Sequence, residues 1–95
     1  MITAIVLVKA EVHRIPEVAE ALAELGGVSE VYSVTGNVDL IAIVRVREHE
    51  QFAEVIADRL NKVDGVTSTE THIAFRTYSR HDLESAFAIG SDDGD

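Results

Sequence analysis

The stretch "VSEVYSVTGNVDLIAIVRV", Val28 to Val46, decides the fold of this chain. Both ends of it are rich in β-branched and apolar residues, which is typical of strands. Gly36 and Asn37 lie between the two apolar runs, and both residue types tolerate the positive φ angle that tight turns require. The stretch therefore predicts a β-hairpin whose strands cover 28–35 and 38–47 and whose turn is formed by Gly36 and Asn37.

Four further segments surround this hairpin. Residues 2–8 are short and apolar almost without interruption, as in a strand that is buried on both faces. Residues 15–25 and 51–63 carry apolar side chains at helical spacing, and glycine, the usual residue after a helix, follows each of them. Residues 66–80 alternate as a strand does. The expected order is strand, helix, strand, strand, helix, strand.

This order predicts an α+β protein with the ferredoxin-like βαββαβ fold. Two βαβ halves with right-handed crossovers would interleave into a four-stranded antiparallel sheet, with both helices on one face. The other face would then be bare in a protomer, and neither alternating set of side chains within 39–45 is polar enough to face water. We expect a second sheet from an identical chain to cover it, which gives a dimeric α+β barrel.

The composition limits the classes of function. A chain of 95 residues forms one domain, and 46% hydrophobic residues with 26% charged residues is typical of a folded chain. The net charge of -9 opposes direct binding of nucleic acid. The absence of cysteine excludes disulfides and fits a cytoplasmic location, and the N-terminus lacks a signal peptide's basic region. No apolar run approaches the ~20 residues of a membrane span.

The chain divides into a folded domain and a C-terminal extension. We expect the ferredoxin-like domain to cover 1–80. Within 81–95, "HDLESAFAIG" predicts a short helix, and "SDDGD" has the composition of a disordered acidic tail.

Three features, which follow one another along the chain, resemble those of a known protein family. They are a Val-Thr-Gly-x-x-Asp hairpin, an amphipathic helix and a Gly-Val-x-x-Thr-x-Thr-x-Ile strand, within residues 2–78. Together they resemble the effector-binding (RAM) domain of the Lrp/AsnC family. Members of that family carry a helix-turn-helix module before this domain, so this sequence resembles a stand-alone form that lacks it. The resemblance implies sheet-on-sheet dimers, a ring of commonly four dimers, and amino acids or related small molecules bound between dimers.

Five residues are candidates for binding an effector: Gly36, Asn37, Asp39, Thr69 and Thr71. By local chemistry alone, the first three form and stabilise a turn, and threonine is a common strand residue. A glycine also lets backbone N–H groups approach a ligand carboxylate, and Asp39 would attract an α-ammonium group. The resemblance places Gly36, Asp39 and the two threonines in the effector crevice.

The remaining polar residues predict no further site. The four histidines (His13, His49, His72 and His81) are scattered, so we expect no metal, and no motif suggests a cofactor. Ion pairs across strands, or contacts between chains, explain the three arginines Arg45, Arg47 and Arg76, because Glu30, Glu48 and Glu70 lie near them in the strand pattern.

Three functions remain open. The first is a non-enzymatic effector-sensing and oligomerisation module of the Lrp/AsnC type, which regulates transcription or metabolism and co-assembles with full-length relatives. The second is a cofactor-free enzyme similar to small monooxygenases, with His72 or Tyr32 beside an enclosed substrate; it needs a cavity between helices and sheet. The third is an ACT-type module, which usually pairs sheets side by side, whereas the bare apolar face predicts face-to-face packing.

Overall fold

The computed structural model describes residues 1–80. Four strands and one α-helix form the body of the protein: β1 (Ile2–Ala10), α1 (Ile15–Ala23), β2 (Val28–Ser33), β3 (Leu40–Val46) and β4 (Val66–Ile73). A 3-10 turn, η1 (Val12–Arg14), precedes α1. Between β3 and β4 lies a second helical segment, wound as a π-helix, η2 (Ala53–Arg59), and then as a 3-10 turn, η3 (Leu60–Lys62). The expected order of elements is confirmed.

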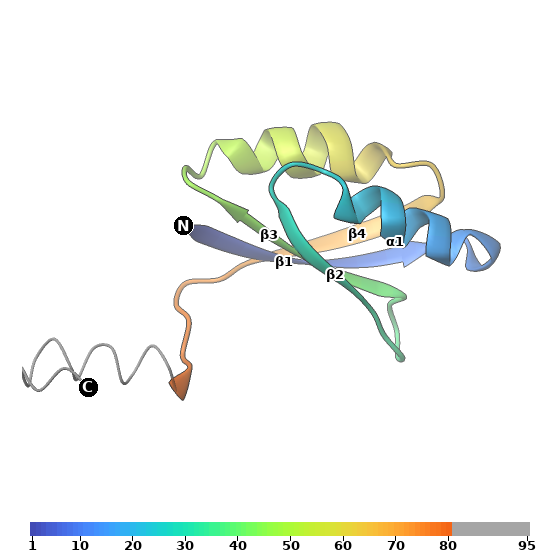
Figure 1. Ribbon diagram of the computed structural model, residues 1–95, viewed down its shortest axis with the longest axis horizontal. Helices are drawn as coiled ribbons and strands as arrows, with labels where there is room; N and C mark the ends of the chain where they lie inside the picture. Colours follow the sequence, from blue (N-terminus) through green and yellow to red (C-terminus); the bar gives the residue numbers. More distant parts are fainter. Residues whose placement is uncertain (81–95) are drawn as a thin grey trace, which may run out of the picture.

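The strands form one antiparallel sheet in the order β2-β3-β1-β4. Both helical segments lie on the same side of this sheet (Figure 1). The predicted ferredoxin-like α+β architecture is therefore confirmed. The first strand lies at the centre of the sheet between β3 and β4, which explains why its sequence is almost entirely apolar.

The core fills the space between the sheet and the helices. Alternate residues of β1 pair with alternate residues of β3, so that Ala4 lies opposite Val44, Val6 opposite Ala42 and Val8 opposite Leu40. All six are fully buried, and Val18, Leu22 and Leu60 from the helical segments are fully buried against them. Burying a valine or leucine side chain contributes about 1.5–3 kcal/mol, so this layer supplies most of the driving force for folding.

The opposite face of the sheet, which we call the open face, carries a second apolar set. Ile5 lies opposite Ile43, and Leu7 opposite Ile41, so these four side chains share one face at the centre of the sheet. No described helix covers them, and Ile5 keeps 36% of its surface exposed. Of the two alternating groups of side chains within 39–45, the group that contains the isoleucines therefore lies on the open face. The expected burial of residues 2–8 on both faces is wrong for an isolated protomer.

Several strand ends differ from the sequence-based prediction. β2 ends at Ser33 and β3 begins at Leu40, so a loop over 34–39, closed by a hydrogen bond from the Val34 N–H to the Asp39 carbonyl, replaces the two-residue turn. The last strand ends at Ile73 instead of continuing to Arg80. Its neighbour β1 begins at Ile2, so beyond the bond from the Ala74 N–H to the Thr3 carbonyl no strand remains for it to pair with.

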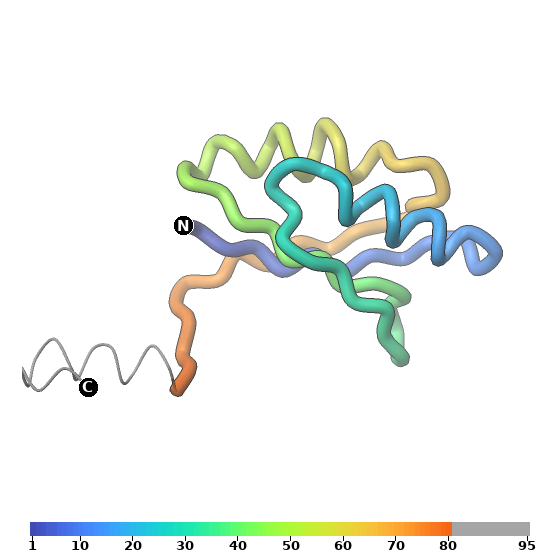
Figure 2. The backbone as a smooth tube through the Cα atoms, in the orientation of Figure 1, coloured from blue at the N-terminus to red at the C-terminus, as the bar shows by residue number. Residues whose placement is uncertain are grey.

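The backbone leaves the sheet at two places on the open side. Figure 2 shows that the tip of the β2–β3 hairpin and residues 74–80 both extend away from the helices. Phe75 in the second segment is 100% exposed. The predicted C-terminal helix and acidic tail, 81–95, lie outside the described residues.

Candidate functional site

Asp39 lies at the end of β1 and is held there through its backbone and its side chain. Its N–H donates to the carbonyl of Val8 at 2.9 Å, and its Oδ2 accepts a hydrogen bond from the Ala10 N–H, also at 2.9 Å. The side chain is half-buried. Its Oδ1 has no donor among residues 1–80. One carboxylate oxygen therefore stabilises the fold, and the other remains available to a ligand.

Thr69 lies on the other side of the same strand end. It pairs with Val8 in the sheet, so its side chain points towards the helices. Its hydroxyl bonds to the Asn61 Oδ1 at 2.8 Å, and the neighbouring Thr67 donates from its hydroxyl to the Lys9 carbonyl at 3.1 Å. A shallow pocket of about 230 Å³ lies beside these groups, lined by Asn61, Val66, Thr67, Ser68 and Thr69.

The other candidates lie close to this end of the sheet without joining the same cluster. Thr71 pairs with Val6, one step further along on the same face, and is exposed. Gly36 and Asn37 lie at the exposed hairpin tip. Gly36 has a φ of 110°, and a Cβ added there would meet no atom within 4 Å. The structure thus brings Asp39 and Thr69 to either side of the end of β1 and leaves the glycine turn open to solvent.

Asn61 is the residue of this region that sequence reasoning missed. It precedes the last strand and belongs to η3, whose 3-10 winding differs from the α-helix expected over 51–63. Its side chain reaches Thr69 only because η3 and β4 are packed together. The neighbouring Thr67 was visible in the alternating pattern of β4, but its bond to β1 depends on the sheet register.

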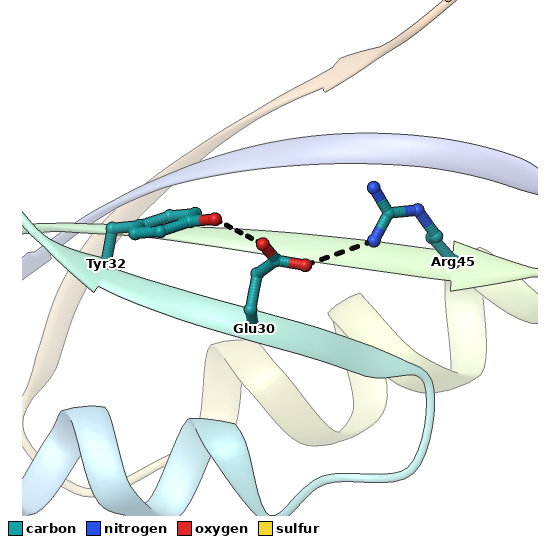
Figure 3. A network of polar contacts seen from close by, with 3 residues as sticks. All are labelled: Glu30, Tyr32 and Arg45. Carbon is teal, nitrogen blue, oxygen red and sulfur yellow. Dashed lines mark hydrogen bonds and ion pairs between the residues drawn. The ribbon is translucent and has the colours of Figure 1, made fainter. Parts of the chain in front are cut away.

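A polar network lies on the open face at the β2–β3 edge (Figure 3). Glu30 accepts a hydrogen bond from the Tyr32 hydroxyl and pairs with Arg45 Nη1 at 3.2 Å. The hydrogen bond from Tyr32, and then the one from Arg45, hold the pKa of the Glu30 carboxyl below its ordinary value. The same bond to the carboxylate raises the pKa of the Tyr32 hydroxyl. Arg45 is therefore paired across strands as predicted.

Glu70 and the other two arginines differ from the predicted cross-strand pairing. Glu70 pairs with His72 at 2.8 Å on the open face, not with an arginine. The guanidinium groups of Arg47 and Arg76 have no acidic partner within the part of the chain that is described. Cross-strand ion pairs are therefore not formed there within residues 1–80, because both arginines lie beyond the paired residues of the sheet. The alternative, contacts between chains, stays a prediction.

The packing between the helices and the sheet tests the hypothesis of a cofactor-free enzyme. That hypothesis needed a cavity there, beside His72 or Tyr32. The layer is instead filled by fully buried aliphatic side chains, and both His72 and Tyr32 belong to the open face.

Within residues 1–80, no helix is both long and apolar enough to cross a membrane.

Known proteins resemble this chain in sequence and in fold. The sequence pattern described as the Lrp/AsnC ligand binding domain matches residues 3–83. An HTH-type transcriptional regulator of Pyrococcus furiosus is 39% identical over 72 residues, which make up 76% of this chain and 49% of that protein. The crystal structure of TTHA0845 from Thermus thermophilus has a TM-score of 0.79 and 46% identity, over 84% of this chain and 100% of that one.

A more distant structure is that of the transcriptional regulator NMB0573 from Neisseria meningitidis, in complex with L-Met. It has a TM-score of 0.74 at 15% identity, over 83% of this chain and 53% of that one, so it shows the fold alone. The chain spans about half the length of the curated relatives it matches. Those relatives are named as transcriptional regulators, which supports a regulatory role and disfavours an enzymatic one. The family pattern covers most of the chain and the fold agrees with it, so the protein belongs to the Lrp/AsnC ligand-binding domain family.

Proposed function

We propose that the protein is an effector-binding and oligomerisation module. It pairs with a second copy through the open face, and the dimers assemble further into a ring. A free amino acid, or a related small molecule, binds between dimers and changes the assembly or its affinity for a partner. The observation that carries this proposal is the apolar centre of the open face, formed by Ile5, Leu7, Ile41 and Ile43.

The distribution of charge on the open face supports pairing with a second sheet. The apolar side chains occupy the middle of the two central strands, whereas charged groups surround them, with Glu30 on β2, Glu70 and His72 on β4, and Arg45 near the end of β3. An apolar centre with a polar rim is the usual anatomy of a protein interface. Soluble monomers rarely leave a large contiguous apolar patch open to water.

The groups around the end of β1 match the two charges of an amino acid. The exposed turn at Gly36 offers backbone N–H groups to a carboxylate, and nothing near that glycine blocks their approach. The free Oδ1 of Asp39 suits an ammonium group. In a single protomer these groups lie on the surface. A neighbouring dimer would enclose them, which is why binding and assembly are proposed to be linked.

The family description and one relative support this choice of ligand. The matching domain is described as ligand-binding, and NMB0573, which shares the fold, was crystallised with L-Met. The relatives named as HTH-type regulators also suggest a partner, because a relative with the same domain would present an equivalent sheet face. Co-expression with a tagged relative of this kind tests that part, and a failure to co-purify would count against it.

Native mass spectrometry with and without a pool of the twenty amino acids tests the central proposal. We expect an even-numbered assembly that retains at least one amino acid or changes size in its presence. Asp39→Asn is the informative variant, because the amide oxygen still accepts the Ala10 hydrogen bond while the charge that would attract ammonium is lost. Asp64→Asn is the matched control, since Asp64 is exposed and, among residues 1–80, pairs only with Arg14.

The outcomes test amino-acid binding and the pairing of sheets separately. Loss of amino-acid binding in Asp39→Asn but not in Asp64→Asn supports the assigned site. A dimer that ignores every amino acid overturns the sensing role and leaves the pairing of sheets intact. A monomer overturns the role of the open face.

A further inference from the structure

A second site lies at the other end of β3. Asp39 directly precedes this strand, whereas Arg45 and Arg47 lie at its far end. There the strand end meets the α1–β2 loop and η2, and the three surround a pocket of about 290 Å³. Three of the eight basic residues in a chain of net charge -9 line it, Arg45, Arg47 and Arg59, together with Glu54. The guanidinium of Arg45 is turned towards Glu30 on the open face. Arg45 pairs with Glu30 and Arg59 pairs with Glu54, so among residues 1–80 the positive charge of Arg47 is the one without a paired carboxylate at this pocket.

The π-helical winding of η2 brings the third arginine into the pocket. Glu54 and Arg59 are five residues apart and form an ion pair of 2.9 Å. In an α-helix, residues five apart point about 140° away from each other. In a π-helix, whose hydrogen bonds join residues five apart, they come to the same side. The Nη1 of Arg59 thereby lies over the α1–β2 loop, 3.9 Å from where a Cβ on Gly26 would stand.

The guanidinium groups of these arginines keep donors that no residue within 1–80 uses, and those of Arg47 and Arg59 are the ones beside the helical segment. Arg45 bonds to Glu30 through Nη1 alone, and Arg59 bonds to Glu54 through Nη2 alone. Each guanidinium carries five N–H donors, so most of them remain free. The guanidinium of Arg47 has no acceptor anywhere in residues 1–80.

The backbone around Arg47 is held in place. The Oε1 of Gln51 accepts hydrogen bonds from the N–H groups of Arg47 and Glu48, both at 2.9 Å. These two hydrogen bonds fix the turn between β3 and η2 and keep Arg47 at the edge of the pocket. A positive side chain on a fixed turn loses less entropy on binding an anion than one on a flexible loop does.

We propose that this pocket binds a small oxyanion that carries two negative charges, of the phosphate or dicarboxylate class. Arg47 is its main anchor, and the free donors of Arg59 complete the binding groups. Planar guanidinium groups bind both oxyanions through paired hydrogen bonds. The site is separate from the one proposed at Asp39 and does not depend on it.

An NMR titration of the uniformly ¹⁵N-labelled protein with inorganic phosphate tests this proposal. Sodium chloride at equal ionic strength serves as the reference, and a parallel titration with succinate separates the two anion types. We expect saturable shifts of the backbone amides of Gly26, Gly27 and Arg47 with at least one of the two anions and not with chloride. A response that follows ionic strength alone overturns the site.

Three variants locate the binding groups. Arg47→Gln should weaken binding about tenfold, which corresponds to about 1.4 kcal/mol. Arg76→Gln is the matched control, because Arg76 also lacks an acidic partner among the described residues but does not line this pocket. Glu54→Gln should tighten binding, because it releases Arg59 from a competing carboxylate. Equal weakening in Arg47→Gln and Arg76→Gln, or weaker binding in Glu54→Gln, contradicts the assignment.

Discussion

The carboxylate of Asp39 accepts a hydrogen bond at 2.9 Å from the backbone N–H of Ala10, 29 residues earlier in the chain. This contact ties the start of β3 to the end of β1, where the register with β4 shifts between Lys9 and Ala10. Removing the acceptor leaves the Ala10 donor unpaired in a buried residue. We predict that Asp39→Ala lowers the free energy of unfolding by about 1–2 kcal/mol.

Urea denaturation of Asp39→Ala and Asp39→Asn measures this effect. The asparagine variant retains an oxygen acceptor and should lose much less stability than the alanine variant. Equal losses in the two variants would show that the charge of Asp39, not its hydrogen bond to Ala10, stabilises the strand end.

A charge placed on the open face should prevent association. Ile43 lies at its centre, opposite Ile5, so Ile43→Asp would bury an unpaired carboxylate against a second sheet. We predict a monomer by light scattering coupled to size exclusion, at concentrations where the unmodified protein is a dimer or larger. Ala23→Asp, at the exposed end of α1, is the control and should leave the assembly unchanged. If both variants keep the original size, another surface joins the chains.

The Glu30–Tyr32 pair should respond to pH on both sides of neutrality. The pKa of Glu30 is lowered in the folded protein, so its contribution to stability is present above the unfolded pKa and is lost as the pH falls through the folded value. The pKa of Tyr32 is raised, so its contribution is present below the unfolded pKa and is lost as the pH rises through the folded value. The pair therefore stabilises the protein between about pH 4 and about pH 10.

Ultraviolet absorbance titration of tyrosine ionisation checks this prediction, with Tyr32→Phe identifying the signal of Tyr32. In Glu30→Gln the carboxylate that raises the pKa of Tyr32 is gone, and Tyr32 should ionise at a lower pH than in the unmodified protein. An unchanged titration curve in Glu30→Gln would mean that the two side chains do not interact in solution.

Two glycines with positive φ should differ in their tolerance of alanine. Gly27 has a φ of 95°, and a Cβ there would lie 2.8 Å from the Cγ2 of Val55, too close for a normal contact. Gly36 has a φ of 110° but open space around it. Alanine at Gly36 therefore costs only the backbone strain, about 1–2 kcal/mol, whereas alanine at Gly27 adds an overpacking cost of about 1–3 kcal/mol.

Thermal unfolding of the two variants, with the unmodified protein as reference, compares these costs. The melting temperature of Gly27→Ala should fall clearly below that of Gly36→Ala. The reverse order would indicate that Val55 moves aside more easily than the hairpin tip accepts a side chain.

Sequence patterns alone were sufficient to predict the architecture. Residues 28–46 identify two adjacent strands, and the amphipathic spacing of 15–25 identifies α1. Local periodicity succeeds here because each element must bury one apolar face against the same sheet. The glycine at 36 was correctly placed in the turn, because its positive φ is a local requirement.

The prediction failed where a contact distant in sequence decides the local structure. The hairpin loop is longer than the Gly36–Asn37 turn: it closes between Val34 and Asp39, and Asp39 is also held by β1 through Val8 and Ala10. The last strand ends at Ile73 because its partner strand begins at Ile2. The helix after β3 winds as a π-helix, which a pattern typical of an α-helix does not reveal.

The sequence by itself determined the order of the elements, the apolar set of side chains that each strand carries, and the resemblance to the Lrp/AsnC family. These properties follow from local propensities and from the spacing of apolar residues. Only the tertiary structure decided which set faces the helices, that one Asp39 oxygen is already occupied by Ala10, and that Arg47 has no carboxylate beside it within residues 1–80. These properties depend on register and on packing between distant segments, which local spacing does not encode.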